Sequence, residues 1–192
     1  MDICETLRKR RTIRRFMQKT IPDGDLRALI DAARLASCAA NMQRLRFVVV
    51  RTMPLVNIVL ANTKWAARVQ PRRNPKAGET GPSAFIAVTM PSTANDVHIY
   101  ADAGAAIQSM QLAAWGRGIG CCWIGSVNFP EVEKLLEIGD ARKLIYLVAL
   151  GYPAEAPTSE DVSKPEEIPY YLDEQDTLHV PKLTVDAVST WK

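Results

Sequence analysis

Four short apolar segments, separated by longer stretches with helical patterns, constrain the fold of this chain most strongly. They have the length and composition of buried strands, which we expect at 46–50 (RFVVV), 84–90 (AFIAVTM), 121–125 (CCWIG) and 144–150 (LIYLVAL). Helices are expected before and between them, at 2–9, 23–36, 54–69, 96–116 and 131–138. Because 192 residues suit one domain with a substantial core, we expect a single domain over 1–192.

The last part of the chain, residues 152–192, has a different character. Five of the 12 prolines lie there, and little regular structure can be predicted. A structureless segment of this length is uncommon within a compact domain. The segment is nevertheless too apolar for a free tail, with Tyr170, Tyr171, Leu172, Leu178 and Val180. We therefore expect an extended arm that packs on a surface, that of a partner subunit being the favoured one.

Composition and cysteines limit the classes of protein to consider. The net charge is +3 and 47% of the residues are hydrophobic, as in an ordinary folded protein. No apolar run could cross a membrane, and the start MDICETLRKR lacks an apolar signal segment, so we expect a cytoplasmic protein without a membrane partner. Metal-binding and disulfide patterns are absent from the four cysteines, and we expect no metal. Cys121 and Cys122 should pack as small hydrophobes, and Cys38 should also pack passively.

Six positive charges lie within eight residues at 8–15 (RKRRTIRR), and such a cluster needs an anion. The segment combines guanidinium groups, a hydroxyl and backbone amides, which suit a phosphate monoester, at Arg10, Arg11, Thr12 and Arg14. A solvated surface patch explains the same residues equally well. A non-enzymatic nucleic-acid-binding module is a further alternative, but the low net charge and the lack of a binding-module signature disfavour it. We expect no nucleic-acid partner.

Two other segments have features of a ligand site, although each also fits an ordinary part of the core. A loop of small residues between the helix at 23–36 and the strand at 46–50 carries Asn41 and Gln43, whose amides could bond the edge of a flat ring. The strand at 121–125 ends in Trp123, Ile124 and Gly125, where backbone amides can face a ligand.

In this order and spacing, the three segments resemble the FMN-dependent nitroreductase family. The family pattern R-R-S-x-R is similar to residues 10–14, with Thr12 in place of serine. The pattern A-P-S-A-x-N-x-Q-P-W-R-F is similar to 36–47 (ASCAANMQRLRF). A third pattern, from D-x-G-x-A-x-Q to W-I-G, resembles 102–125 almost position by position. The ending at 170–182 (YYLDEQDTLHVPK) is similar to the tail of one branch of the family.

The resemblance implies an α+β, nitroreductase-like fold. Its central sheet would be mixed but mostly antiparallel and flanked by helices, and its C-terminal arm would be exchanged over the partner in a homodimer. It further implies FMN as the cofactor and NAD(P)H as the co-substrate. The enzyme would take hydride from NAD(P)H and reduce a small flat acceptor, such as a nitroaromatic, a quinone or another flavin, by a ping-pong mechanism. No catalytic side chain is implied, because the flavin carries the chemistry.

The resemblance also assigns cofactor-binding residues. The FMN phosphate and ribityl chain would be held by Arg10, Arg11, Thr12 and Arg14. The loop that reaches the flavin from the partner subunit would contribute Cys38, Ala39 and Asn41, with Gln43 a further candidate. The strand end beside the ring would contribute Trp123, Ile124 and Gly125.

Three departures from the family pattern bear on these assignments. Ser37-Cys38 replaces Pro-Ser and puts a thiol near the flavin, and Arg44-Leu45 replaces Pro-Trp near the substrate pocket. The basic pair that often follows the G-Y-P segment is missing, and acidic residues stand at 158–161 (TSED). Loss of such charge-assisted bonds would weaken FMN binding by a few kcal/mol.

Two further interpretations stay open. Specialised members of the wider family fragment flavin, dehalogenate aromatics or oxidise azoline rings, and the change at Arg44-Leu45 is compatible with such a role. A loop at 72–74 (Arg72, Arg73 and Asn74) could border the active site, but we expect it to be solvated. His179 lies in an apolar context and is expected to be structural.

Overall fold

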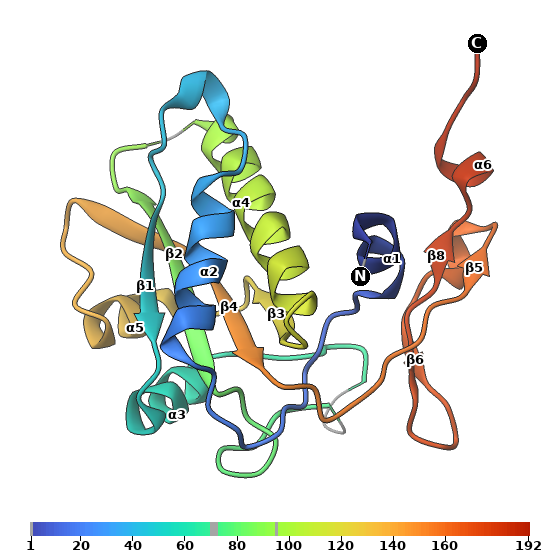
Figure 1. Ribbon diagram of the computed structural model, residues 1–192, viewed down its shortest axis with the longest axis horizontal. Coiled ribbons are helices and arrows are strands. Elements are labelled where there is room, and N and C mark those ends of the chain that lie inside the picture. Colours follow the sequence, from blue (N-terminus) through green and yellow to red (C-terminus); the bar gives the residue numbers. More distant parts are fainter. Residues whose placement is uncertain (1, 70–72, 95) are drawn as a thin grey trace.

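A computed structural model of the chain describes residues 2–69, 73–94 and 96–192 (Figure 1). Its centre is a four-stranded sheet in the order β1 (Arg46–Val50), β2 (Ala84–Pro91), β4 (Arg142–Gly151) and β3 (Gly120–Ile124). The three pairings are antiparallel, with a register shift between Val88 and Thr89 of β2. The four expected strands are therefore confirmed, but the burial expected for β1 is wrong: only Val50 is buried, because β1 lies at the edge of the sheet. Strands β1 and β3 form the two edges of the sheet.

Helices cover both faces of the sheet. The long helix α4 (Val97–Trp115) and α2 (Asp23–Arg34) lie side by side on one face, and α3 (Met53–Ala61) and α5 (Phe129–Leu135) belong to the other layer (Figure 1). Alternation along β2 explains the two cores, because Ile86 and Val88 pack under α2 and α4 while Phe85 and Ala87 face α3. This arrangement confirms the α+β class.

The helix expected at 54–69 ends at Ala61 instead. The following residues leave the helix because other partners take their backbone groups: Lys64 N donates to Ser126 O over 2.9 Å, and Thr63 forms a bridge with Val127. Trp65 is buried beneath this segment, with its indole N donating to the Thr63 hydroxyl over 2.7 Å. The segment is thus a loop that buries Trp65 and brings Lys64 to the end of β3.

The N-terminal helix α1 (Ile3–Lys9) and the C-terminal segment lie at one side of the body, and β1 lies at the opposite side (Figure 1). Beyond β4 the chain forms two small pairings, β5 (Asp161–Val162) with β8 (Lys182–Leu183) and β6 (Tyr171–Leu172) with β7 (Leu178–His179). The short helical pieces are η1 (Ala39–Asn41), η2 (Pro165–Glu167) and α6 (Val185–Val188). Of the helices described, none combines the length and apolarity needed to cross a membrane.

Candidate functional site

The basic segment lies against the outer edge of β3. Thr12 forms a parallel bridge with Cys121, and Ile13 N donates to Cys121 O over 3.0 Å. Ile13 and Phe16 are fully buried, so this segment is anchored by its apolar residues while the arginines between them stay at the surface or half-buried. Gly120 permits the contact, because a Cβ at this position would lie 2.6 Å from the Ile13 side chain. The basic segment is therefore fixed alongside β3, with Arg14 next to the strand end predicted to meet a ligand.

Arg10, Arg11 and Arg14 have no carboxylate partner among the described residues. Arg11 instead donates to the Arg8 and Arg10 carbonyls and to the Ser159 hydroxyl. Burial lowers the pKa of the Arg10 guanidinium and also that of Arg11. Half-buried cations without a counter-charge favour a bound anion, so these residues fit a phosphate group.

A pocket of about 320 Å³ opens at the end of β3 next to this cluster. Its walls include Arg14, Lys64, Trp123, Ile124 and Gly125. Trp123 is 39% exposed and meets Tyr146 edge to face, with ring centroids 5.0 Å apart. The structure thus brings four of the predicted site residues together around one pocket. Lys64 adds a second cation, which the sequence could not reveal because its segment reads as a helix.

The 38–43 loop, which is predicted to contact the flavin bound by a partner subunit, lines a different pocket of about 220 Å³. This pocket shares no lining residue with the pocket at the end of β3. Asp102 of α4 fixes this loop by accepting a bond from Ala39 N over 2.9 Å. Gln43 N donates to the Cys38 sulfur over 3.4 Å, and the Gln43 amide donates to Asn41 Oδ1 over 2.9 Å. Ala40, Asn41 and Gln43 have positive φ, so the loop is tightly turned. Within one chain these residues do not meet Arg14 and Trp123.

Arg44, the residue that departs from the family pattern near the expected substrate pocket, is held at the start of α4. Its guanidinium pairs with Asp96 over 2.9 Å, and its side chain is only 17% exposed. Asp96 also caps the helix by accepting from His98 N. The backbone bond from His98, followed by the bond from Arg44, lowers the pKa of Asp96. The charge of Arg44 is therefore neutralised locally.

The acidic segment that replaces the family's basic pair lies within the C-terminal arm and contacts the later residues of the arm. Glu160 accepts a bond from the Tyr171 hydroxyl over 3.0 Å, which raises the pKa of Tyr171. Tyr171 stacks on His179, and the His179 imidazole bonds Asp173 over 2.9 Å. These contacts support the structural role expected for His179. Arg14 also faces the arm, with its guanidinium 5.2 Å from the centre of the Tyr170 ring.

The expectation of a solvated loop at 72–74 is wrong for Arg73, while Arg72 lies outside the described residues. The Arg73 side chain is 3% exposed and lies between two carboxylates, those of Glu155 and Asp176. Its guanidinium is thus buried in an ion-pair network next to the basic segment. The sequence carries no signal for this burial, because both partners lie more than 80 residues away.

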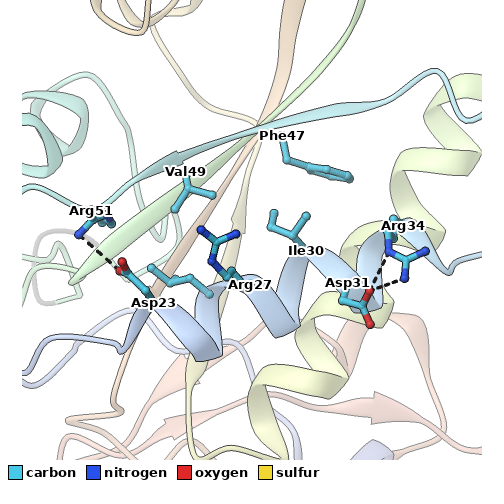
Figure 2. A pocket seen from close by; sticks show the side chains of 9 residues that line it. Asp23, Arg27, Ile30, Asp31, Arg34, Phe47, Val49 and Arg51 are labelled. Atoms are coloured by element: carbon cyan, nitrogen blue, oxygen red, sulfur yellow. Dashed lines mark hydrogen bonds and ion pairs between the residues drawn. The ribbon is translucent and has the colours of Figure 1, made fainter.

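A third pocket, of about 460 Å³, lies between α2 and the free edge of β1 (Figure 2). Ile30, Phe47 and Val49 point into it, and Asp23–Arg51 and Asp31–Arg34 ion pairs lie at its two ends. Val49 is 38% exposed, although it lies on a strand of the central sheet. This edge of the sheet therefore combines unpaired backbone groups with apolar side chains.

Comparisons with known proteins identify the family of the chain. The Nitroreductase family profile matches residues 7–152. A Methanothermobacter thermautotrophicus protein named as an NADH dehydrogenase/NAD(P)H nitroreductase is 25% identical over 173 residues, covering 88% of this chain and 86% of its own. An Archaeoglobus fulgidus protein with the same name is 28% identical over 166 residues, with coverages of 81% and 88%.

Solved structures show the same relationship. A Desulfovibrio desulfuricans protein titled as a nitroreductase in complex with FMN superposes with a TM-score of 0.67 at 26% identity, covering 88% of this chain and 95% of that chain. A nitroreductase family protein from Clostridium novyi shares the fold with a TM-score of 0.69 at 23% identity, with coverages of 80% and 86%. The family match spans most of the chain and includes the basic segment, the 38–43 loop and the end of β3, so the chain belongs to the nitroreductase family.

Proposed function

We propose that the protein is an FMN-dependent oxidoreductase that takes hydride from NAD(P)H and reduces a small flat acceptor, such as a nitroaromatic, a quinone or a flavin. The observation that carries this proposal is the arrangement at β3. Arg10 and Arg14, two cations without carboxylate partners among the described residues, border the pocket or the strand that forms it. Family membership and the FMN complex of the Desulfovibrio relative support the same cofactor.

Different residues of this chain would bind different parts of FMN. Arg10, Arg11, Thr12 and Arg14 would hold the phosphate and the ribityl chain, while the backbone at 123–125 would lie beside the ring system. FMN, when bound, supplies the redox chemistry. Arg14 and Lys64 place positive charge in the pocket, which favours a reduced, anionic state of the ring. Trp123, whose ring meets that of Tyr146 edge to face, forms one wall of the pocket.

The proposed order of reaction is ping-pong, in which NAD(P)H gives up its hydride and leaves as NAD(P)+ before the acceptor enters the same site. Acceptors with a flat ring are favoured because the open wall is formed by the aromatic side chain of Trp123.

The protein is further proposed to act as a homodimer, with the arm at 152–192 packed on the partner. In one chain the 38–43 loop and the β3 pocket are separate half-sites, and a second copy could bring them together. The arm extends away from the body on the side opposite β1 (Figure 1). Val185, Val188 and Trp191 of the arm are 67%, 67% and 82% exposed. The pocket along β1, in which Ile30, Phe47 and Val49 lie among charged side chains, offers them a surface on another copy (Figure 2).

The proposed function is tested by the visible spectrum of the purified protein, followed by NAD(P)H oxidation with menadione as acceptor. Flavin absorption bands and menadione-dependent oxidation are expected. An Arg14→Met variant should lose bound flavin, whereas Arg8→Met, which removes an exposed arginine of the same run, should retain it. A colourless protein that also fails to quench FMN fluorescence on titration would overturn the proposal.

A further inference from the structure

We infer that Arg73 is a positioning residue for the phosphate site, acting by neutralising the buried Glu155 carboxylate that organises the basic segment. The inference rests on the proposed function, because it concerns how the chain accepts the FMN phosphate. It assigns a role to a residue of the 62–83 segment that lies outside the three family motifs.

The Glu155 carboxylate fixes the backbone of the basic segment by hydrogen bonds. One carboxylate oxygen accepts bonds from both Arg14 N and Arg15 N, the second over 3.1 Å. The chain on either side is fixed as well, since Ala154 N donates to Arg15 O over 2.9 Å and Phe16 forms a bridge with Pro153. With its amide turned toward Glu155, Arg14 can line the β3 pocket with its side chain.

This arrangement places the negative charge of Glu155 next to Arg14, a residue proposed to bind the FMN phosphate. The Glu155 side chain is 6% exposed, so water screens its charge poorly. A carboxylate in contact with the Arg14 amide would repel a phosphate that Arg14 binds. The phosphate site can therefore work only if this carboxylate is compensated.

Arg73 provides the compensation. It is the ion-pair partner of Glu155 within the described part of the chain, with Nε 3.3 Å from Oε2 and a side chain that is 3% exposed. The two atoms are buried and form no hydrogen bond, so the interaction is one of charge. Removal of either member of such a pair leaves an uncompensated buried charge.

The C-terminal arm holds Arg73 in this place. The Arg73 guanidinium donates to the Asp176 carboxylate over 2.8 Å and to the Asp176 carbonyl. Asp176 lies in the turn between β6 and β7, which is closed by a 2.7 Å bond from Thr177 N to Asp173. Because Arg73 is shared between two carboxylates, it is not available to bind phosphate itself. Its effect on FMN should therefore pass through Glu155.

This indirect role predicts a specific pattern in FMN and riboflavin binding, measured by fluorescence quenching. Arg73→Met should lower the ratio of FMN to riboflavin affinity about tenfold, because riboflavin lacks the phosphate. Arg73→Lys should keep the ratio. The double variant Arg73→Met/Glu155→Gln should restore it to within about threefold of wild type, since the repelling charge is gone. Arg117→Met, which removes an exposed arginine that pairs with Asp25, serves as the matched control and should leave the ratio unchanged.

Equal losses of FMN and riboflavin affinity in Arg73→Met would overturn the inference. So would a double variant whose ratio of FMN to riboflavin affinity is no higher than that of Arg73→Met. If circular dichroism shows that Arg73→Met does not fold, Glu155→Gln alone carries the test. The ratio of FMN to riboflavin affinity in this variant should stay at or above the wild-type ratio. A tenfold fall would contradict the proposal that the Glu155 charge repels the phosphate. Failure of the wild-type protein to bind either flavin would instead overturn the proposed function.

Discussion

Ile13 lies so close to Gly120 that the two residues together fix the basic segment on β3: a Cβ at Gly120 would lie 2.6 Å from Ile13 Cγ1 and 2.8 Å from its Cβ. Ile13 is fully buried and donates its amide to Cys121 O over 3.0 Å. The absence of a side chain at position 120 thus determines how near the arginines come to the strand end. Gly151 does the same for Phe16, at 2.7 Å.

Gly120→Ala should displace the basic segment and weaken FMN binding. The added methyl group has no space, and overpacking of this kind costs roughly 1–3 kcal/mol of stability. Chemical denaturation and FMN titration would measure the two effects. Gly104→Ala is the matched control, because its Cβ would meet Trp123 at an ordinary 3.7 Å and lies within α4. Equal behaviour of the two variants would show that the Ile13–Gly120 contact does not position the segment.

The cysteines should differ sharply in their reactivity toward iodoacetamide. Burial raises the pKa of Cys122 to about 12 and raises that of Cys121 as well, so neither forms appreciable thiolate at pH 8. Cys4 is exposed and should react first, followed by the partly exposed Cys38. Peptide mass spectrometry over time would measure the order. Early modification of Cys121 or Cys122 in the native protein would contradict the described burial of β3.

Asp96 should stabilise the protein in a pH-dependent way through its bonds to His98 N and Arg44. Its pKa is lowered in the folded state from an ordinary value of 3.8, so its contribution is present above that value and disappears as the pH falls through the lowered pKa. Wild type should therefore melt at a higher temperature than Asp96→Asn at pH 7. The difference should vanish in acid. A melting difference that is the same at pH 7 and pH 2.5 would rule out the ionised carboxylate as its source.

Val49→Lys should weaken the proposed dimer, because a charge at the free edge of β1 opposes docking of the partner's arm. Sedimentation velocity over a concentration series would measure the change. Ile58→Lys is the control, since Ile58 is 47% exposed but lies on α3, in the opposite layer. A dimer that tolerates Val49→Lys as well as it tolerates Ile58→Lys would place the interface elsewhere.

The four strands could be predicted from local pattern alone, because apolar runs of strand length flanked by turns have few other structures, and β2 is buried as expected. The exposure of β1 could not be predicted, because it follows from the place of this strand at the edge of the sheet. The helix expected at 54–69 ends at Ala61 instead, and the sequence could not predict this end. The backbone partners of Thr63 and Lys64, Val127 and Ser126, are distant in sequence. The same limit applies to the site. Motif spacing identified Arg14 and Trp123, but Lys64 and Arg73 take their positions from tertiary contacts that no local pattern encodes.

The most direct test of the account is a comparison of FMN with riboflavin as ligands of the wild-type protein, titrated at one ionic strength. In the proposed site, Arg10, Arg11 and Arg14 bind the FMN phosphate by charge-assisted hydrogen bonds, each of which contributes about 1.5–3 kcal/mol. FMN should therefore bind at least about tenfold more tightly than riboflavin. Equal affinities for the two flavins would contradict the role given to the basic segment.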